Sequence, residues 1–281
     1  MIQSPSKEQI QWWVNLGLEE DLGSGDITTE SIITDDHPLK VRAVAREPLV
    51  LCGGDIFRAV FATLDPSATF QTSFQDGDQA SEGAVLFQVS ANCVALLKGE
   101  RTALNILQRL SGIATLTRRF VERAGSVTVL DTRKTTPGLR VFEKYAVACG
   151  GGKNHRFGLF DAALVKDNHI KAAGGISRAV ALVRKNLDPS LKIEVETSNL
   201  DEVEEALKAD VEVIMLDNMS LETIREAAKK AKGKAHIEVS GSVTLDRMEE
   251  LAAAGIDSVS VGALTHSAKA VDISMNIVNP S

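Results

Sequence analysis

The feature that most constrains this chain is the regular alternation of apolar and amphipathic segments in its second half. Short runs rich in β-branched residues alternate with segments whose apolar residues recur at helical spacing. The strand-like runs are SVTVLDT (126–132), DAALVKD (161–167), KIEVETS (192–198), VEVIMLDN (211–218), AHIEVSGS (235–242) and SVSVGAL (258–264). This order predicts parallel strands joined by right-handed helical crossovers. Roughly six such units favour an incomplete (β/α) barrel over an open dinucleotide-binding sheet, because no GxGxxG follows the first run.

The first part of the chain has a different pattern. Ser6 and Gln9 have the spacing of a capping box and predict a short N-terminal helix. From Lys40 to Leu97, β-like runs separated by turn residues such as Asp76-Gly77 indicate a small mixed sheet that serves scaffolding or assembly. Leucines at helical intervals then predict a helix over 99–125 that is interrupted near Ser111-Gly112 and acts as a hinge between two domains.

Charge and cysteine content exclude several classes of protein. The formal net charge is -7, so the basic residues concentrated between Asp131 and His169 form a local site for an anion, and general binding to nucleic acid is disfavoured. The three cysteines are few, widely spaced and set among apolar residues, which indicates buried thiols in a reducing compartment. We found neither a signal-peptide pattern nor an apolar run that could span a bilayer, and we therefore expect a cytoplasmic protein without a membrane partner.

Polar residues stand where the predicted strands end. In a (β/α) barrel the carboxyl ends of the strands meet at one mouth, where active sites are built. Arginines and lysines there suit carboxylates and pyrophosphate, the two carboxylates suit a divalent metal or ribose hydroxyls, and the Ser-Gly-Ser and Val-Gly-Ala segments suit a phosphomonoester. The strand-end residues are Arg133, Lys134, Lys166, Glu196, Asp217, Ser240, Gly241, Ser242, Val261, Gly262 and Ala263, and Arg156 belongs to the same cationic set.

Several longer motifs resemble one known family. They are LEEDLGSGDITTE near the start, GERTALN (99–105), TRKTTPGLR (132–140), KYAVACGGGKNHR (144–156), KDNH (166–169), EVE (194–196), LDN (216–218) and EVSGS (238–242). In order and spacing they resemble nicotinate-nucleotide pyrophosphorylase (carboxylating), also called quinolinate phosphoribosyltransferase, an enzyme family of NAD biosynthesis. The resemblance implies a homodimer with an N-terminal α/β sandwich at 1–112, an incomplete barrel at 113–267 and a C-terminal segment, 268–281, that packs back on the N-terminal domain. It also implies the substrates quinolinate and phosphoribosyl pyrophosphate, with Mg²⁺.

The same resemblance implies roles for individual residues. The carboxylates of quinolinate are expected at Arg133, His155 and Arg156, with Thr132 beside them and Arg101 entering from the partner subunit. Lys134 and Lys166 are expected to contact quinolinate and the pyrophosphate, and Glu196 and Asp217 to hold ribose hydroxyls and magnesium. The catalytic residues are then Lys134, Lys166, Glu196 and Asp217, and the 5′-phosphate is expected on the backbone of 240–242 and 261–263. One departure is Ser242, where the family pattern has glycine or asparagine.

Two other readings compete with this one. Lysines at strand ends, Lys134 and Lys166, could belong to an aldolase that forms a Schiff base, although this leaves the acidic pair without a role. A non-catalytic scaffold would instead tolerate alanine at every strand end. Reduction with borohydride in the presence of substrate distinguishes the aldolase from the transferase.

Overall fold

The computed structural model describes residues 4–188 and 190–278, which form two compact units. One unit contains the residues up to Arg118 with Thr136–Gly151 and the segment that begins at Ser267, and the other contains Arg119–Thr135 and Gly152–His266. Residues 1–3 and 279–281 of the predicted terminal segments lie outside the described residues. Within the described ranges, no helix has both the length and the apolar character that a membrane span requires.

The first unit contains an antiparallel sheet. Its strands lie in the order β12 (Ile273–Ile277), β1 (Pro38–Ala45), β5 (Val85–Asn92) and β3 (Thr69–Gln71), and a separate pair joins β2 (Leu49–Val50) to β4 (Gln79–Ala80). The mixed sheet expected here is wrong, because every one of these pairings is antiparallel. Strand β12 pairs with β1 although more than half of the chain separates them, so the C-terminal segment is part of this sheet.

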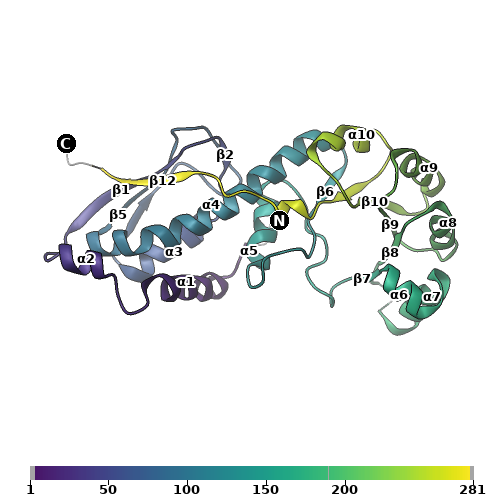
Figure 1. Ribbon diagram of the computed structural model, residues 1–281, viewed down its shortest axis with the longest axis horizontal. Coiled ribbons are helices and arrows are strands. Elements are labelled where there is room, and N and C mark those ends of the chain that lie inside the picture. Colours follow the sequence, from purple (N-terminus) through teal and green to yellow (C-terminus); the bar gives the residue numbers. More distant parts are fainter. Residues whose placement is uncertain (1–3, 189, 279–281) are drawn as a thin grey trace. The chain divides into compact units, whose positions relative to one another are not determined.

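The helices of this unit are α1 (Lys7–Leu22), α2 (Ile27–Ile32), α3 (Gly54–Leu64), α4 (Cys93–Ala124) and α5 (Arg140–Cys149), and α4 ends in the second unit. Figure 1 shows α3 and α4 beside β1, β5 and β12, which makes an α/β sandwich. The Ser6–Gln9 capping box at the start of α1 is confirmed. Helix α3 was not predicted, although Ile56, Phe57 and Val60 form its buried face.

Helix α4 is continuous, so the break expected near Ser111-Gly112 is wrong. A Cβ atom added to Gly112 would lie 2.0 Å from the carbonyl oxygen of Lys269, and glycine is therefore needed for the close approach of another backbone segment. The Ser111 hydroxyl accepts a hydrogen bond from the Cys52 backbone N–H at 3.0 Å. Both residues therefore lie inside a continuous helix and pack it against other segments of the unit. The predicted domain limit between residues 112 and 113 lies inside this helix, and the domain limits remain a prediction.

The Asp76-Gly77 turn exists but does not close a hairpin. It connects β3 to β4, which belong to different sheets. The Asp76 carboxylate accepts hydrogen bonds from the backbone N–H groups of Gly53 and Gly54, both at 3.0 Å, and so satisfies donors at the start of α3. The Tyr145 hydroxyl donates to the same carboxylate at 2.9 Å.

The second unit is an incomplete parallel barrel, as predicted. Its strands lie in the order β6 (Thr128–Leu130), β11 (Ser258–Ser260), β10 (His236–Ser240), β9 (Val213–Asp217), β8 (Ile193–Thr197) and β7 (Ala163–Val165), with β6 and β7 at the two edges. All of these pairings are parallel. The connecting helices are α6 (Asp167–Ala173), α7 (Ile176–Asn186), α8 (Leu200–Lys208), α9 (Leu221–Ala231), a 3-10 turn at Leu245–Arg247, α10 (Met248–Ala252) and α11 (Ala263–His266). Figure 1 shows α7, α8, α9 and α10 along the outer side of the strands.

Candidate active site

A cavity of about 500 Å³ opens at the carboxyl ends of the barrel strands. Most of the residues singled out in the sequence lie on its wall, because parallel strands deliver their following residues to one edge. Its lining consists of Thr132, Arg133, Lys134, His155, Arg156, Leu164, Lys166, Glu196, Met215, Asp217, Asn218, Ser240, Gly241 and Ser260. Leu164, Met215, Asn218 and Ser260 were not predicted. The first two are apolar strand residues, which sequence patterns cannot distinguish from ordinary core.

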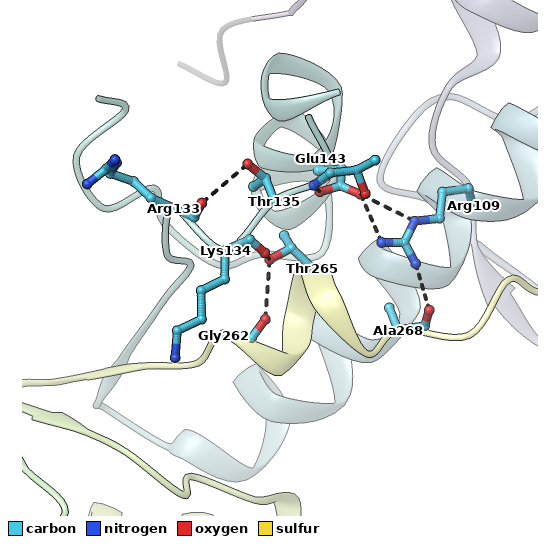
Figure 2. Close-up of polar contacts among 9 residues, drawn as sticks. Arg109, Arg133, Lys134, Thr135, Glu143, Gly262, Thr265 and Ala268 are labelled. Carbon is cyan, nitrogen blue, oxygen red and sulfur yellow. Dashed lines mark hydrogen bonds and ion pairs between the residues drawn. The ribbon is translucent and has the colours of Figure 1, made fainter. Parts of the chain in front are cut away.

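The loop after β6 carries Arg133 and Lys134 into this cavity. The Thr265 hydroxyl donates to the Lys134 carbonyl at 2.7 Å, and Thr265 is fully buried. Figure 2 shows the second contact of this hydroxyl, with the Gly262 carbonyl. The Lys134 N–H donates to the Thr132 hydroxyl at 3.0 Å. A Cβ atom added to Gly262 would lie 2.9 Å from Cδ of Lys134, so the glycine leaves room for the lysine side chain. These contacts fix the backbone of Lys134 and leave its amine directed away from them.

Within the first unit, a buried carboxylate holds the residue that follows this loop. Glu143 has no exposed side-chain surface and accepts hydrogen bonds from the N–H and hydroxyl of Thr136 at 3.0 and 2.9 Å. Arg109 donates to the same carboxylate at 2.8 Å and to the Ala268 carbonyl at 2.7 Å (Figure 2). A buried carboxylate needs such a cation and such donors to offset its loss of hydration. Glu143 is therefore structural.

His155 and Arg156 lie on a loop that is tightly bonded to the end of β6. Asp131, which is fully buried, accepts from the His155 N–H at 2.8 Å and from the Asn154 amide at 2.7 Å. The Arg156 guanidinium donates to the Ala162 carbonyl at 3.3 Å. Burial lowers the pKa of Arg156, and the nearby charge of Arg133 lowers it further. Two arginines thus crowd one wall, an arrangement that an anionic ligand would stabilise.

The imidazole of His155 is engaged on both sides. Its Nδ1 accepts from the Arg156 N–H at 2.8 Å, and its Nε2 lies 3.0 Å from Glu194 and 3.6 Å from Glu238. Direct contact of His155 with a substrate carboxylate, as the family resemblance implies, would require a ring nitrogen to leave its present partner. Glu194 and Glu238 were missed by the sequence analysis. The sequence did contain a signal for Glu194, because side chains two residues apart on a strand share one face, and Glu194 is two residues from Glu196.

The acidic wall is formed by Glu196 and Asp217 on neighbouring strands. Lys166 donates to Glu196 at 3.0 Å, so the cationic and acidic walls are already joined at this point. Asp217 accepts from the Asn218 amide at 2.9 Å.

The donor set fits Mg²⁺ only in part. The described residues contain two groups of three or more possible ligands within reach of one ion, Cys52–Asp76–Cys149 and His155–Glu194–Glu238, and neither contains Glu196 or Asp217. Two carboxylates from neighbouring strands match a magnesium ion that takes most of its ligands from phosphate oxygens and water. A complete protein cage is not built here.

The two segments expected to bind phosphate, 240–242 and 261–263, differ in whether they line the cavity and in whether their backbone is already hydrogen-bonded. Ser240 and Gly241 line the cavity, and Ser242 follows with φ of 51°, a left-handed conformation that glycine and asparagine adopt more readily than serine. Glycine or asparagine, expected here from the family resemblance, would fit this backbone conformation with less strain. The Val261 N–H donates to the Leu130 carbonyl at 2.9 Å, and its side chain is buried. Val261 is thus committed to strand pairing, which corrects the expectation that its N–H is available to phosphate.

Comparison with known proteins identifies the family. The N-terminal domain of quinolinate phosphoribosyl transferase matches residues 26–111, and the C-terminal domain of the same family matches residues 113–276. The chain belongs to the quinolinate phosphoribosyltransferase family. A probable nicotinate-nucleotide pyrophosphorylase [carboxylating] of Synechocystis sp. is 45% identical over 274 residues, which cover 96% of this chain and 92% of that protein. A protein of Bacillus subtilis with the same description is 40% identical over 271 residues, covering 96% and 93%.

Solved structures of the quinolinate phosphoribosyltransferase family share the whole fold. The nicotinate-nucleotide pyrophosphorylase from Francisella tularensis aligns with a TM-score of 0.95 and 40% identity, and the alignment covers 99% of each chain. The family resemblance seen in the sequence motifs is therefore confirmed over both units. Arg101, the residue expected to act on a partner subunit, lies on α4 in the first unit and is exposed.

Proposed function

We propose that this chain transfers the phosphoribosyl group of phosphoribosyl pyrophosphate to the ring nitrogen of quinolinate. The 2-carboxylate leaves as CO₂, and the products are nicotinate mononucleotide, pyrophosphate and CO₂, an entry step to NAD. The observation that carries the proposal is the cavity with Arg133 and Arg156 on one wall and Glu196 and Asp217 on another. Such a cavity offers cations to a dicarboxylate and carboxylates to a ribose within one barrel mouth.

The cationic wall binds and orients the pyridine ring. The guanidinium groups of Arg133 and Arg156 pair with carboxylates in a bidentate manner, which fixes the ring plane and aims its nitrogen at the ribose. Lys134 and Lys166 supply further positive charge for quinolinate and for the leaving pyrophosphate. Positioning of this kind accounts for a large part of the rate, because the reaction needs no nucleophilic side chain.

The acidic wall stabilises the ribose as the bond to pyrophosphate breaks. The ribose then carries positive charge like an oxocarbenium ion, and Glu196 and Asp217 lie where they can hold its hydroxyls and offset that charge. Glu196 and Asp217 would hold Mg²⁺, which when bound would supply positive charge to the departing pyrophosphate. We expect the 5′-phosphate on the backbone of Ser240, Gly241 and Ser242, with Gly262 and Ala263 after the neighbouring strand β11.

Decarboxylation follows ribosylation. Once the ring nitrogen carries the ribose it is cationic, and the ring can accept the electron pair that the 2-carboxylate leaves at C2. That pair then takes a proton. The carboxylate at C3 remains and keeps the product bound to the cationic wall.

The Schiff-base alternative is not supported. A lysine that attacks a carbonyl must present a neutral, desolvated amine. Lys166 instead forms an ion pair with Glu196, and 46% of its side chain is exposed. Both family domains also match the transferase.

A single assay tests the proposed function. The purified protein is expected to consume quinolinate only when phosphoribosyl pyrophosphate and Mg²⁺ are both present, and to release CO₂ and nicotinate mononucleotide in equal amounts. We would follow ¹⁴CO₂ from 2-carboxyl-labelled quinolinate together with the nucleotide by chromatography. Consumption without phosphoribosyl pyrophosphate, or nucleotide without CO₂, would contradict the proposal. The buried, free cysteines fit a reducing cytoplasm as the site of the reaction.

The proposal includes a homodimer in which Arg101 enters the cavity of the neighbouring subunit. It is supported by the exposure of Arg101 and by the GERTALN motif around it. Mixing inactive Arg101→Ala with inactive Lys134→Ala is expected to restore part of the activity. A hybrid dimer then contains one site without either substitution and one site with both.

The control for this experiment is subunit exchange itself, measured by native mass spectrometry of the mixture. A second mixture, of Arg119→Ala with Lys134→Ala, is the matched control. Arg119 is another arginine of α4, so this mixture controls for the loss of an arginine from that helix. Complete absence of recovery in a mixture that contains hybrid dimers would show that each site is built from one chain.

A further inference from the structure

Two buried glutamates lie beneath the cavity without lining it. Glu194 on β8 and Glu238 on β10 retain 8% and 2% of their surface, and Glu194 shares a strand face with Glu196. Buried carboxylates are costly unless a partner offsets the loss of hydration. Both approach Nε2 of His155, Glu194 at 3.0 Å and Glu238 at 3.6 Å.

The hydrogen bonds define the state of the His155 ring. Because the Arg156 N–H donates to Nδ1 at 2.8 Å, Nδ1 acts as an acceptor and carries no proton. The proton of the neutral ring is therefore on Nε2, which donates it to Glu194. In this state His155 adds no positive charge to the cavity, and neither nitrogen is turned to a ligand.

The same ring holds Arg156 in place. The Nδ1 bond restrains the backbone of Arg156, while Asp131 restrains the backbone of His155 through its N–H at 2.8 Å. The guanidinium is held at its far end by the Ala162 carbonyl. Rotation of the imidazole would remove the acceptor from the Arg156 N–H, so the bond from Nε2 to Glu194 determines whether this chain of contacts persists.

We propose that Glu194 is a positioning residue: it fixes the neutral ring of His155, and through that ring it aims Arg156 at a carboxylate of the substrate. The proposal rests on the proposed function for the identity of that substrate. Glu238 assists as a buried acid beside Glu194. Burial, and then the charge of Glu194, raises the pKa of Glu238 to about 7. The pair therefore avoids two full negative charges below a site for anions.

Substitution of Glu194 tests the proposal by kinetics. Glu194→Ala is expected to raise the KM for quinolinate, and the Kd for the unreactive dicarboxylate phthalate, by about 10- to 100-fold, the effect of one lost hydrogen bond to a charged group. The KM for phosphoribosyl pyrophosphate should change by less than about threefold, since Glu194 contacts His155, whereas the ribose is expected at Glu196 and Asp217. Glu194→Gln should recover most of the affinity, because an amide oxygen also accepts from Nε2–H.

The matched control is Glu212→Gln, directly before the adjacent strand β9, where the carboxylate accepts from the Ile193 N–H. It is expected to leave all three constants near those of the unsubstituted enzyme. Equal increases of both KM values in Glu194→Ala, or a Glu194→Gln enzyme as impaired as the alanine variant, would overturn the proposal. Tighter phthalate binding by Glu194→Ala would do so as well, because Glu194 would then act only as a repelling charge.

A spectroscopic measurement remains decisive if a variant folds poorly or if the unsubstituted protein does not turn over quinolinate. The chain has five histidines, so ¹⁵N ring resonances of a histidine-labelled sample can be assigned to His155 by their loss in His155→Asn. The expected pattern is a protonated Nε2 and an unprotonated Nδ1 at neutral pH. A doubly protonated ring, a protonated Nδ1, or a divalent metal on Nε2 found by elemental analysis would each contradict the proposal.

Discussion

Replacing Arg133 by alanine is expected to lower kcat/KM for quinolinate by roughly 30-fold to several thousand-fold and to affect nicotinate much less. Truncation of one member of a buried charge pair costs about 2–5 kcal/mol, and each 1.4 kcal/mol is about a factor of ten. Nicotinate has one carboxylate and quinolinate has two. In the free enzyme, Arg133 and Arg156 crowd one another, since the charge of Arg133 contributes to the lowered pKa of Arg156. A dianion relieves this repulsion and a monoanion relieves it only in part.

Steady-state kinetics with both acids measure this discrimination directly. The unsubstituted enzyme should prefer quinolinate by the same range, and phthalate should inhibit competitively against quinolinate whereas benzoate should not. Arg225→Ala, on the exposed surface of α9, is the control for loss of one arginine. Comparable kcat/KM values for the two acids, or an equal loss for both in Arg133→Ala, would show that the second carboxylate contributes nothing to recognition.

The barrel and most of its active wall could be predicted because both follow from short-range patterns. β-branched runs and amphipathic segments alternate with a clear period, and parallel strands bring the residues that follow them to one edge. Glu196 and Asp217 were therefore recognisable from their positions alone. His155 and Arg156 follow no strand directly. Their place in the cavity depends on the loop that returns to β6 through Asp131. Arg156 was singled out by its charge, and His155 only by the family motif around it.

The features that could not be predicted depend on contacts between distant segments. Gly112 suggests a helix break in the sequence, but its role is the close approach of Lys269. Asp76 has the pattern of a hairpin turn, but its carboxylate satisfies the start of a helix more than twenty residues earlier. Glu238 lies within an apolar strand, and its sequence neighbours give no reason for a buried carboxylate there. The reason is its contact with His155 and Glu194, which come from distant segments. In each case the local pattern alone does not give the role of the residue, because a distant segment of the chain determines it.

Replacing Asp217 by alanine is expected to lower kcat by ~10²–10³, the usual effect of removing one preorganised electrostatic contact from a transition state. Asp217 ends β9 and is paired in register with Ser240 of β10, so its backbone is held by the neighbouring strand. The Asn218 amide fixes one carboxylate oxygen at 2.9 Å. The carboxylate is thus oriented before substrate binds, and its effect should appear in kcat while the KM for quinolinate stays within a few-fold.

Asp217→Asn separates charge from shape. The asparagine keeps an oxygen for Asn218, so a loss as large as that of alanine would assign the effect to negative charge at the ribose and its metal. Asp201→Asn, on the exposed first turn of α8, is the matched control and should retain full turnover.

Removal of divalent ions by a chelator tests the metal separately in the unsubstituted enzyme, where turnover should cease and return with Mg²⁺. Full turnover after chelation would show the metal assignment to be wrong. Glu196 and Asp217 would then act on the ribose hydroxyls alone, and the kcat loss in Asp217→Ala would persist at every magnesium concentration. If metal binding is instead the main role of Asp217, raising Mg²⁺ should recover part of the loss, because a weakened site fills again at higher ion concentration.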